Sequence, residues 1–327
     1  MLKKLLLFGT ALAIFSTTAT AQIVDEKKMA ALKTENAKDG DGWKTGGSIG
    51  LDLSQLMLIN PKVGGGDNRI GGGGAIGLFA NKKTGKFVWN STGTLQLAAQ
   101  RIGDSKQPFQ KNIDILRLTT EAGILSKNPK LYYGAIASFE SQLLKTYKGN
   151  FIKSDVKGDL LSKFLAPARI KAGLGIGYKP TPKLSFFFAP LSVQYIYVGD
   201  DVLAKDFKVY GNDEGKNSST QGGAQLIGRY NDKFMKDKIV FGSNLELFSA
   251  YTNNFGRIDV LWHNDLGIQL FKNITLSIFT DTFYDDDTQV VVERAVAATA
   301  TVPAKVQKLG LKPSFAQGIL IKYGRTF

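Results

Sequence analysis

Large apolar side chains recur at every second position along most of this chain, with polar or small residues between them. The clearest case is ARIKAGLGIGYK at 168–179, in which Ile170 and Leu174 alternate with Arg169 and glycines. Successive side chains of a β-strand point to opposite faces, so this period of two predicts strands with one apolar and one polar face.

Twelve segments carry the pattern and are bounded by turn-forming residues, which predicts twelve strands. They are 46–57, 70–80, 87–101, 113–124, 131–143, 168–178, 184–197, 222–231, 239–251, 257–270, 274–284 and 314–326.

The connections alternate in length. Odd-numbered strands are followed by long segments such as 145–167, 198–221 and 285–313, although TNNFG at 252–256 is short. Even-numbered strands are mostly followed by tight, lysine-bearing turns such as NKKTGK and SKNPK. Outer-membrane barrels have long outer loops, short periplasmic turns and an even number of strands. The fold class predicted is therefore all-β: a transmembrane antiparallel up-and-down β-barrel of about twelve strands, with ten to fourteen compatible.

The first residues have the features of a secretory signal peptide. A basic MLKK start, an apolar LLLFGTALAIF run and Ala19-Thr20-Ala21 predict cleavage after Ala21. We expect a signal peptide at 1–21, a polar periplasmic N-terminal segment at 22–42, a barrel at 43–327, and location in the cell outer membrane. The chain has no cysteine, which excludes disulfides and a lipid-anchored lipoprotein.

The final strand, GILIKYGRTF, ends on an aromatic residue. Tyr323 and Phe327 resemble the recognition signal that the outer-membrane barrel assembly machinery reads, so that machinery is a predicted partner.

The segments GWKTGGSIGLDLSQ at 42–55, FLAPARIKAGLGIGYKP at 164–180 and APLS at 189–192 resemble a family common in Bacteroidetes-type bacteria. That family is known only as a domain of unknown function and is regarded as an outer-membrane β-barrel. The resemblance covers about 42–327 and implies the same fold. It implies no catalytic residues.

Charged residues on the polar faces of the strands are close to balanced. Those predicted to point inward are Arg117, Arg169, Lys171, Arg229 and Lys322 against Asp52, Glu121, Glu140, Glu246, Asp259, Asp265 and Asp281. Opposite charges around a narrow interior can pair across it. We therefore predict a polar network in the lumen formed by Arg117, Glu121, Glu140, Arg169, Lys171, Arg229, Glu246, Asp259, His263 and Asp265. Arg117 and Glu121, four residues apart on one face, suit such a network.

The formal charge of +14 falls to +12 when Lys3 and Lys4 are removed with the signal peptide. Since the lumen is balanced, the basic excess lies in turns and loops. Lysines there would contact outer-membrane lipid phosphates and lipopolysaccharide. This placement argues against a nucleic-acid partner.

No motif predicts a cofactor. The glycine runs 64–66 and 71–74 are not followed by Lys-Ser/Thr and do not lie between a strand and a helix, which excludes a P-loop. The segment DTFYDDDT at 281–288 is rich in oxygen ligands, but it lacks the glycine turn and the closing glutamate of an EF-hand. A solvated loop is the preferred interpretation, and no metal site is predicted.

Three functions fit the sequence. The leading hypothesis is a passive pore for small solutes. The alternative is a structural or partner-binding barrel that acts through its long extracellular loops. An outer-membrane lipid hydrolase is the third, because an outer-membrane phospholipase of twelve strands exists and His263, the only histidine, would be the base of such a Ser-His site. Its predicted lumen-facing position, beside Asp259 and Asp265, favours a hydrogen-bond network over a lipid-facing catalytic base, so no enzymatic activity is predicted.

Overall fold

The computed structural model describes residues 41–56, 69–103, 106–156, 158–252, 255–293 and 308–326. The predicted signal peptide, nearly all of the N-terminal segment 22–42 and Phe327 lie outside these residues. In the part of the chain that the structure describes, no helix is long and apolar enough to cross a membrane.

Twelve antiparallel strands pair in a closed ring, β1-β16-β13-β12-β11-β10-β9-β8-β5-β4-β3-β2. Their bounds are β1 Gly42–Leu56, β2 Arg69–Thr84, β3 Phe87–Ile102, β4 Gln110–Leu125, β5 Leu131–Ser141, β8 Ala168–Thr181, β9 Leu184–Tyr197, β10 Ser218–Phe234, β11 Ile239–Ala250, β12 Asp259–Phe271, β13 Ile274–Tyr284 and β16 Ser314–Thr326. Every neighbouring pair along the chain is hydrogen-bonded, and the predicted all-β antiparallel up-and-down barrel is confirmed.

The ring closes where β1 meets β16. The pairing there runs from Ser48–Thr326 to Leu51–Tyr323, whereas β1 pairs with β2 over its whole length. Closure of the sheet removes open edges, whose backbone N–H and C=O groups would otherwise need partners elsewhere.

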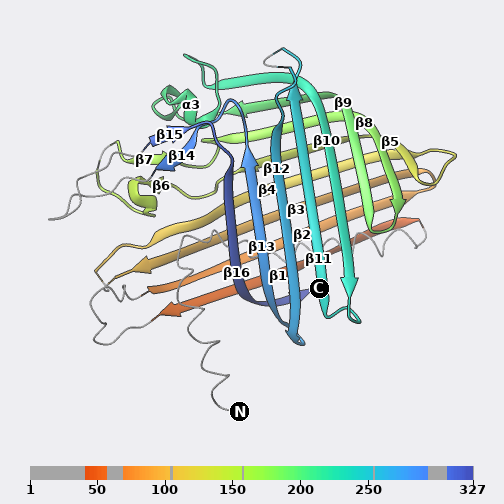
Figure 1. Cartoon of the computed structure of the whole chain (residues 1–327), viewed down its shortest axis with the longest axis horizontal. Coiled ribbons are helices and arrows are strands. Elements are labelled where there is room, and N and C mark those ends of the chain that lie inside the picture. The colour runs from red at the N-terminus through yellow and green to blue at the C-terminus, as the bar shows by residue number, and fades with distance from the viewer. Residues whose placement is uncertain are drawn as a thin grey trace.

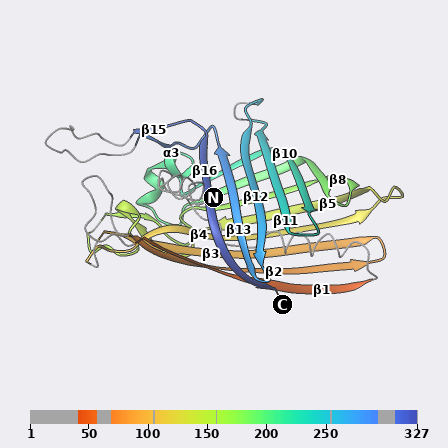
Figure 2. The same ribbon diagram turned by 60° about the horizontal axis from the view of Figure 1, so that its bottom comes forward.

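The barrel is flattened into two walls. In Figures 1 and 2 the strands β1 to β5 run at a steep angle to β10 to β13 and β16. The tight turns at 85–86, 126–130, 182–183, 235–238 and 272–273 lie at one end of the strands, called here the turn end. The other end, called the loop end, carries the long connections.

The distribution of side chains is the reverse of that in a water-soluble protein. Large apolar side chains point away from the lumen and stay exposed, as with Leu174 at 57% and Tyr133 at 58%. Polar side chains are buried inside, as with Gln225 at 2% and Gln194 at 4%. Soluble proteins seldom expose a contiguous apolar surface of this kind, which marks a membrane or protein contact.

Two apolar clusters fill parts of the lumen. Ala75, Ile113 and Phe279 join β2 and β4 to β13 across the barrel. Near the turn end, Tyr132, Ile136, Phe187, Ala189 and Ile227 form the second cluster, called here the inner plug. The first cluster joins opposite sides of the barrel, the inner plug joins β5 to β9 and β10, and both narrow the lumen.

The long connections fold over the loop end (Figure 1). They contain β6 Thr146–Tyr147, η4 Lys148–Asn150, β7 Leu160–Ser162, η5 Leu203–Lys205, α3 Phe207–Tyr210, β14 Val290–Glu293 and β15 Lys308–Gly310. We call residues 142–167 and 198–217 the outer cover. It has its own apolar core of Ala166, Val198, Leu203, Ala204 and Tyr210.

Side-chain hydrogen bonds hold the outer cover together. Tyr210 donates to the carbonyl of Leu161. The Asn212 amide donates to the carbonyls of Ala204 and Lys216, both at 2.7 Å. Burial of the Tyr210 hydroxyl raises its pKa to about 12, so the phenol stays protonated as a donor at neutral pH.

Candidate functional site: a charged cavity inside the barrel

A cavity of about 280 Å³ occupies the lumen, and Ile136 and Ile227 of the inner plug line part of it. At the loop end it is lined by Asp259, the first residue of β12, and by Asp285 just after β13. Toward the turn end it reaches Asn231 and Gly242, which lie within four residues of the β10–β11 turn. Its lining therefore extends along most of the barrel.

The lining changes in character along this length. Toward the turn end the lining includes the uncharged Thr92, Asn231 and Gly242, with Asp265 directly opposite Gly242 in the strand register. Charged side chains line the middle and the loop end. Most of the charge in the lining therefore lies in the middle of the barrel and at the loop end.

One ion pair lies within a single wall. Arg117 on β4 is directly opposite Glu140 on β5 in the strand register. Its Nε and Nη2 donate to Glu140 Oε2 at 2.8 and 2.5 Å. Neighbouring strands bring such opposed residues close together, so this pair needs no contact across the lumen.

Three further ion pairs cross the lumen. Lys171 Nζ on β8 donates to Glu246 Oε1 on β11 at 2.6 Å. Arg169 Nη1 on β8 lies 3.3 Å from Asp285 Oδ2 beyond β13. In the ring β8 is adjacent to neither β11 nor β13. Each of these contacts therefore crosses the interior of the barrel.

The third crossing adjoins the inner plug. Arg229 Nη1 on β10 donates to Glu121 Oε2 on β4 at 2.8 Å. The Tyr132 hydroxyl donates to the second oxygen of Glu121 at 2.5 Å. A buried carboxylate is stable only when both oxygens have partners, and here they do.

Arg169 and Lys171, the two cations that cross the lumen from β8, also contact aromatic rings on the opposite side. The Arg169 guanidinium lies 5.9 Å from the Phe283 ring centre, and Lys171 Nζ lies 5.9 Å from that of Phe248. Cation–π attraction therefore adds to the ion pairs in drawing these side chains across the lumen.

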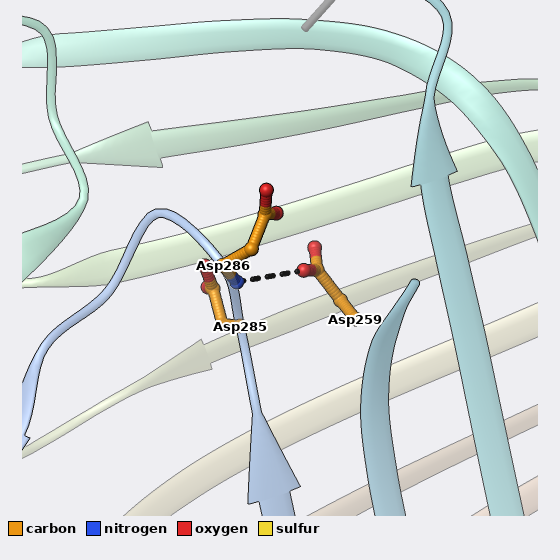
Figure 3. A group of neighbouring side chains, drawn as sticks. All are labelled: Asp259, Asp285 and Asp286. Carbon is orange, nitrogen blue, oxygen red and sulfur yellow. Dashed lines mark hydrogen bonds between the residues drawn. The ribbon is translucent and has the colours of Figure 1, made fainter. Parts of the chain in front are cut away.

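Three carboxylates meet at the loop end of the cavity (Figure 3). Oxygen atoms of Asp259, Asp285 and Asp286 lie within 4.8 Å of one another. The backbone N–H of Asp286 donates to Asp259 Oδ1 at 3.2 Å. Arg169 pairs with Asp285, and Arg257 Nη1 lies 3.4 Å from Asp286 Oδ2, so protein cations offset part of this negative charge.

The acidic segment 281–288 is therefore divided. Asp285 and Asp286 join Asp259 at the cavity, whereas Asp287 accepts a hydrogen bond of 2.5 Å from Gln221 Nε2 on β10. The Asp281 side chain lies outside the described residues. Sequence inspection placed Asp285 in a solvated loop, but its carboxylate is buried. The reason is that it turns inward to meet Arg169.

The structure brings the ten predicted lumen residues together. Nine of them line the cavity: Arg117, Glu140, Arg169, Lys171, Arg229, Glu246, Asp259, His263 and Asp265. The tenth, Glu121, contacts it through Arg229. Arg117 and Glu121 share a face, but each finds its ionic partner on another strand.

Sequence inspection missed Asp285 and Tyr132 as members of this network. Tyr132 lies in the alternating segment of β5, where its hydroxyl gave no signal of an inward position. The terminal Tyr323 is 50% exposed on the outer face of β16.

The sequence of residues 53–147 matches the family described as "Protein of unknown function (DUF3078)". The match begins in the first of the sequence segments noted above and ends before the second. None of the curated proteins matched the chain.

Solved structures with a similar arrangement of strands include an outer membrane channel from Pseudomonas putida F1, with 11% identity, a TM-score of 0.38, and coverage of 88% of this chain and 97% of that one. The translocator domain of autotransporter NalP from Neisseria meningitidis has 10% identity, a TM-score of 0.36, and coverage of 94% and 100%. The outer membrane channel DcaP of Acinetobacter baumannii has 9% identity, a TM-score of 0.29, and coverage of 88% and 98%.

Proposed function

We propose that this chain is an outer-membrane barrel that acts as a narrow passive pore for small polar solutes. The observation that carries the proposal is the polar cavity, whose lining runs from Asp259 at the loop end to Asn231 near the turn end. A chain that only anchored its loops would have no need of a polar route along its axis.

The exterior supports a membrane location. Exposed apolar side chains surround the barrel, and every strand is paired on both sides in the ring. In lipid, backbone groups must find partners within the protein, and a closed barrel provides them. Short turns would then face the periplasm and the outer cover the cell exterior.

The cross-lumen ion pairs set the expected size of the pore. Lys171–Glu246 and Arg169–Asp285 span the route that a solute would follow. A polar interior interrupted by such pairs admits ions and small solutes slowly, unlike the water-filled channel of a barrel with sixteen or more strands.

Planar-bilayer recording tests the pore. The purified, heat-modifiable protein should produce discrete conductance steps in potassium chloride, and Lys171→Gln should shift its ion selectivity toward cations because Glu246 loses its counter-charge. Lys216→Gln is the matched control, since Lys216 forms an exposed pair with Asp213 in the outer cover. Correctly folded protein without any conductance would contradict the proposal.

A structural or partner-binding barrel is the second candidate. The observation in its favour is that the outer cover is folded around its own core and still exposes apolar side chains such as Val156 at 63% and Val202 at 67%. Absence of conductance would favour this function. A lipid hydrolase finds no support in the position of His263, which is buried on the lumen side of β12.

A further inference from the structure

Cations and acids line opposite walls in the middle and outer parts of the cavity. The cations are Arg117 on β4 and Arg169 and Lys171 on β8, while Arg229, on β10 opposite Asn244, is paired with Glu121. The facing acids are Glu246, Asp259, Asp265 and Asp285, on or next to β11, β12 and β13. Glu140 neutralises Arg117 within its own wall. Lys171 and Arg169 are therefore the cations that face the acidic wall.

The pair Lys171–Glu246 must open before a solute passes between the walls. A simple cation would satisfy Glu246 and leave Lys171 without a counter-charge, and a simple anion would do the reverse. Breaking a partly buried ion pair by supplying one partner alone is unfavourable because the other charge stays uncompensated. A solute that carries both charges replaces both partners in one step.

The acidic wall also offers an acceptor for such a solute. Asn244 lies two residues before Glu246 on the same face of β11 and lines the cavity. Its Oδ1 is buried and, among the described residues, has no hydrogen-bond partner. An ammonium group has three donors, so it can bind Glu246 and Asn244 together.

We propose that the level of Lys171 and Glu246 is a binding site for small zwitterions that carry an ammonium and a carboxylate group. The carboxylate binds Lys171, and the ammonium binds Glu246 with the carbonyl oxygen of the Asn244 side chain. The cavity, at about 280 Å³, is several times the roughly 30 Å³ that one water molecule occupies, which leaves room for a solute of this kind. This inference rests on the proposed pore and names the solutes it selects.

The test compares one zwitterion with its two halves. Single-channel current is recorded in potassium chloride at pH 7 with γ-aminobutyrate, butyrate or butylammonium added. We expect γ-aminobutyrate to halve the current at a concentration at least tenfold lower than either half requires. Lys171→Gln and Glu246→Gln should each abolish this tenfold preference, whereas Lys171→Arg, which keeps the charge, should retain it. Lys216→Gln again serves as the control.

The outcomes separate the two proposals. Current that responds equally to the three solutes would overturn the zwitterion site and leave the pore intact. Folded wild-type protein without current would overturn the pore and the site together. The comparison of solutes uses the wild-type protein, so the site stays testable if a variant does not fold.

Discussion

At the scale of single residues, the interior depends on close approaches that small side chains permit. Gly177 on β8 lies against the ring of Tyr132, whose hydroxyl bonds to Glu121. A Cβ atom at Gly177 would lie 1.8 Å from the Tyr132 ring. Because Gly177 has no side chain, the Tyr132 ring can lie where its hydroxyl reaches Glu121, which in turn binds Arg229.

Gly177→Ala should therefore displace Tyr132. We expect a loss of about 1–3 kcal/mol in the free energy of unfolding, as for overpacking in a filled interior. Gly222→Ala is the control, since nothing lies within 4 Å of a Cβ atom at Gly222. Urea unfolding of both variants in lipid vesicles, followed by tryptophan fluorescence, measures the difference. Equal stability of the two variants would contradict this account of the inner plug.

The same scale shows where sequence reasoning stops. The period of two was enough to place Lys171, Glu246 and Glu121 on inward faces, because facing depends only on alternation along a strand. Their partners depend on how far the two walls approach each other and on the stagger of the strands. Neither quantity is a property of any one segment, so the pairs Lys171–Glu246 and Arg229–Glu121 required coordinates.

At the scale of elements, alternation placed all twelve barrel strands. For example, 184–197, 274–284 and 314–326 coincide with β9, β13 and β16. Some strands run further than predicted, as in β10, which begins at Ser218 instead of residue 222, whereas β5 ends at Ser141 instead of residue 143. Polar residues in 218–221 hid this extension. The outer cover could not be predicted, because its apolar core joins residues from two separate loops.

The outer cover depends on Asp200. This carboxylate accepts the N–H groups of Val202 and Leu203 at 3.0 and 3.1 Å and pairs with Lys163 at 2.8 Å. The hydrogen bond from Lys163 is the main cause that lowers its pKa below the ordinary value of 3.8. A depressed pKa stabilises the fold above the unfolded pKa, and the stabilisation is lost as the pH falls through the folded value.

Acid should therefore loosen the outer cover while the barrel persists. We expect hydrogen exchange in 198–211, corrected for the intrinsic effect of pH, to become faster as the pH falls below about 4. Asp200→Ala should show the fast exchange already at pH 7. Glu214→Gln, at an exposed turn of the same cover, should not. Mass spectrometry of the peptides measures both, and unchanged exchange in Asp200→Ala would count against this role.

At the scale of the whole molecule, the two walls are connected by the hydrogen-bonded ring of strands and also by side-chain contacts through the interior. Polar crossings and the two apolar clusters hold β4, β5 and β8 against β10 to β13. Composition and alternation predicted a closed barrel with a charged lumen. A count of twelve strands did not determine whether that lumen is filled or open. The approach of the two sides brings Lys171 and Arg169 on β8 within reach of Glu246 and Asp285.

The ring is completed by the pairing of β16 with β1. Deleting Phe327, the last residue of the sequence, should lower the yield of membrane-inserted, heat-modifiable protein several-fold if this residue is part of an assembly signal. Phe315→Ser is the control, because Phe315 is an exposed aromatic at the opposite end of β16. Gel mobility with and without heating measures the folded fraction. Equal yields from the two variants would remove the assembly role.

The short pairing of β1 with β16 has a mechanical consequence. A solute or force that widened the lumen would act on every strand junction alike, and the one that yields first is the one with fewest backbone hydrogen bonds to break. Among the described residues, the junction from Ser48–Thr326 to Leu51–Tyr323 is the shortest pairing in the ring. Under strain the barrel should therefore separate first between β1 and β16. The charged middle parts of β8 and β11 would keep their register.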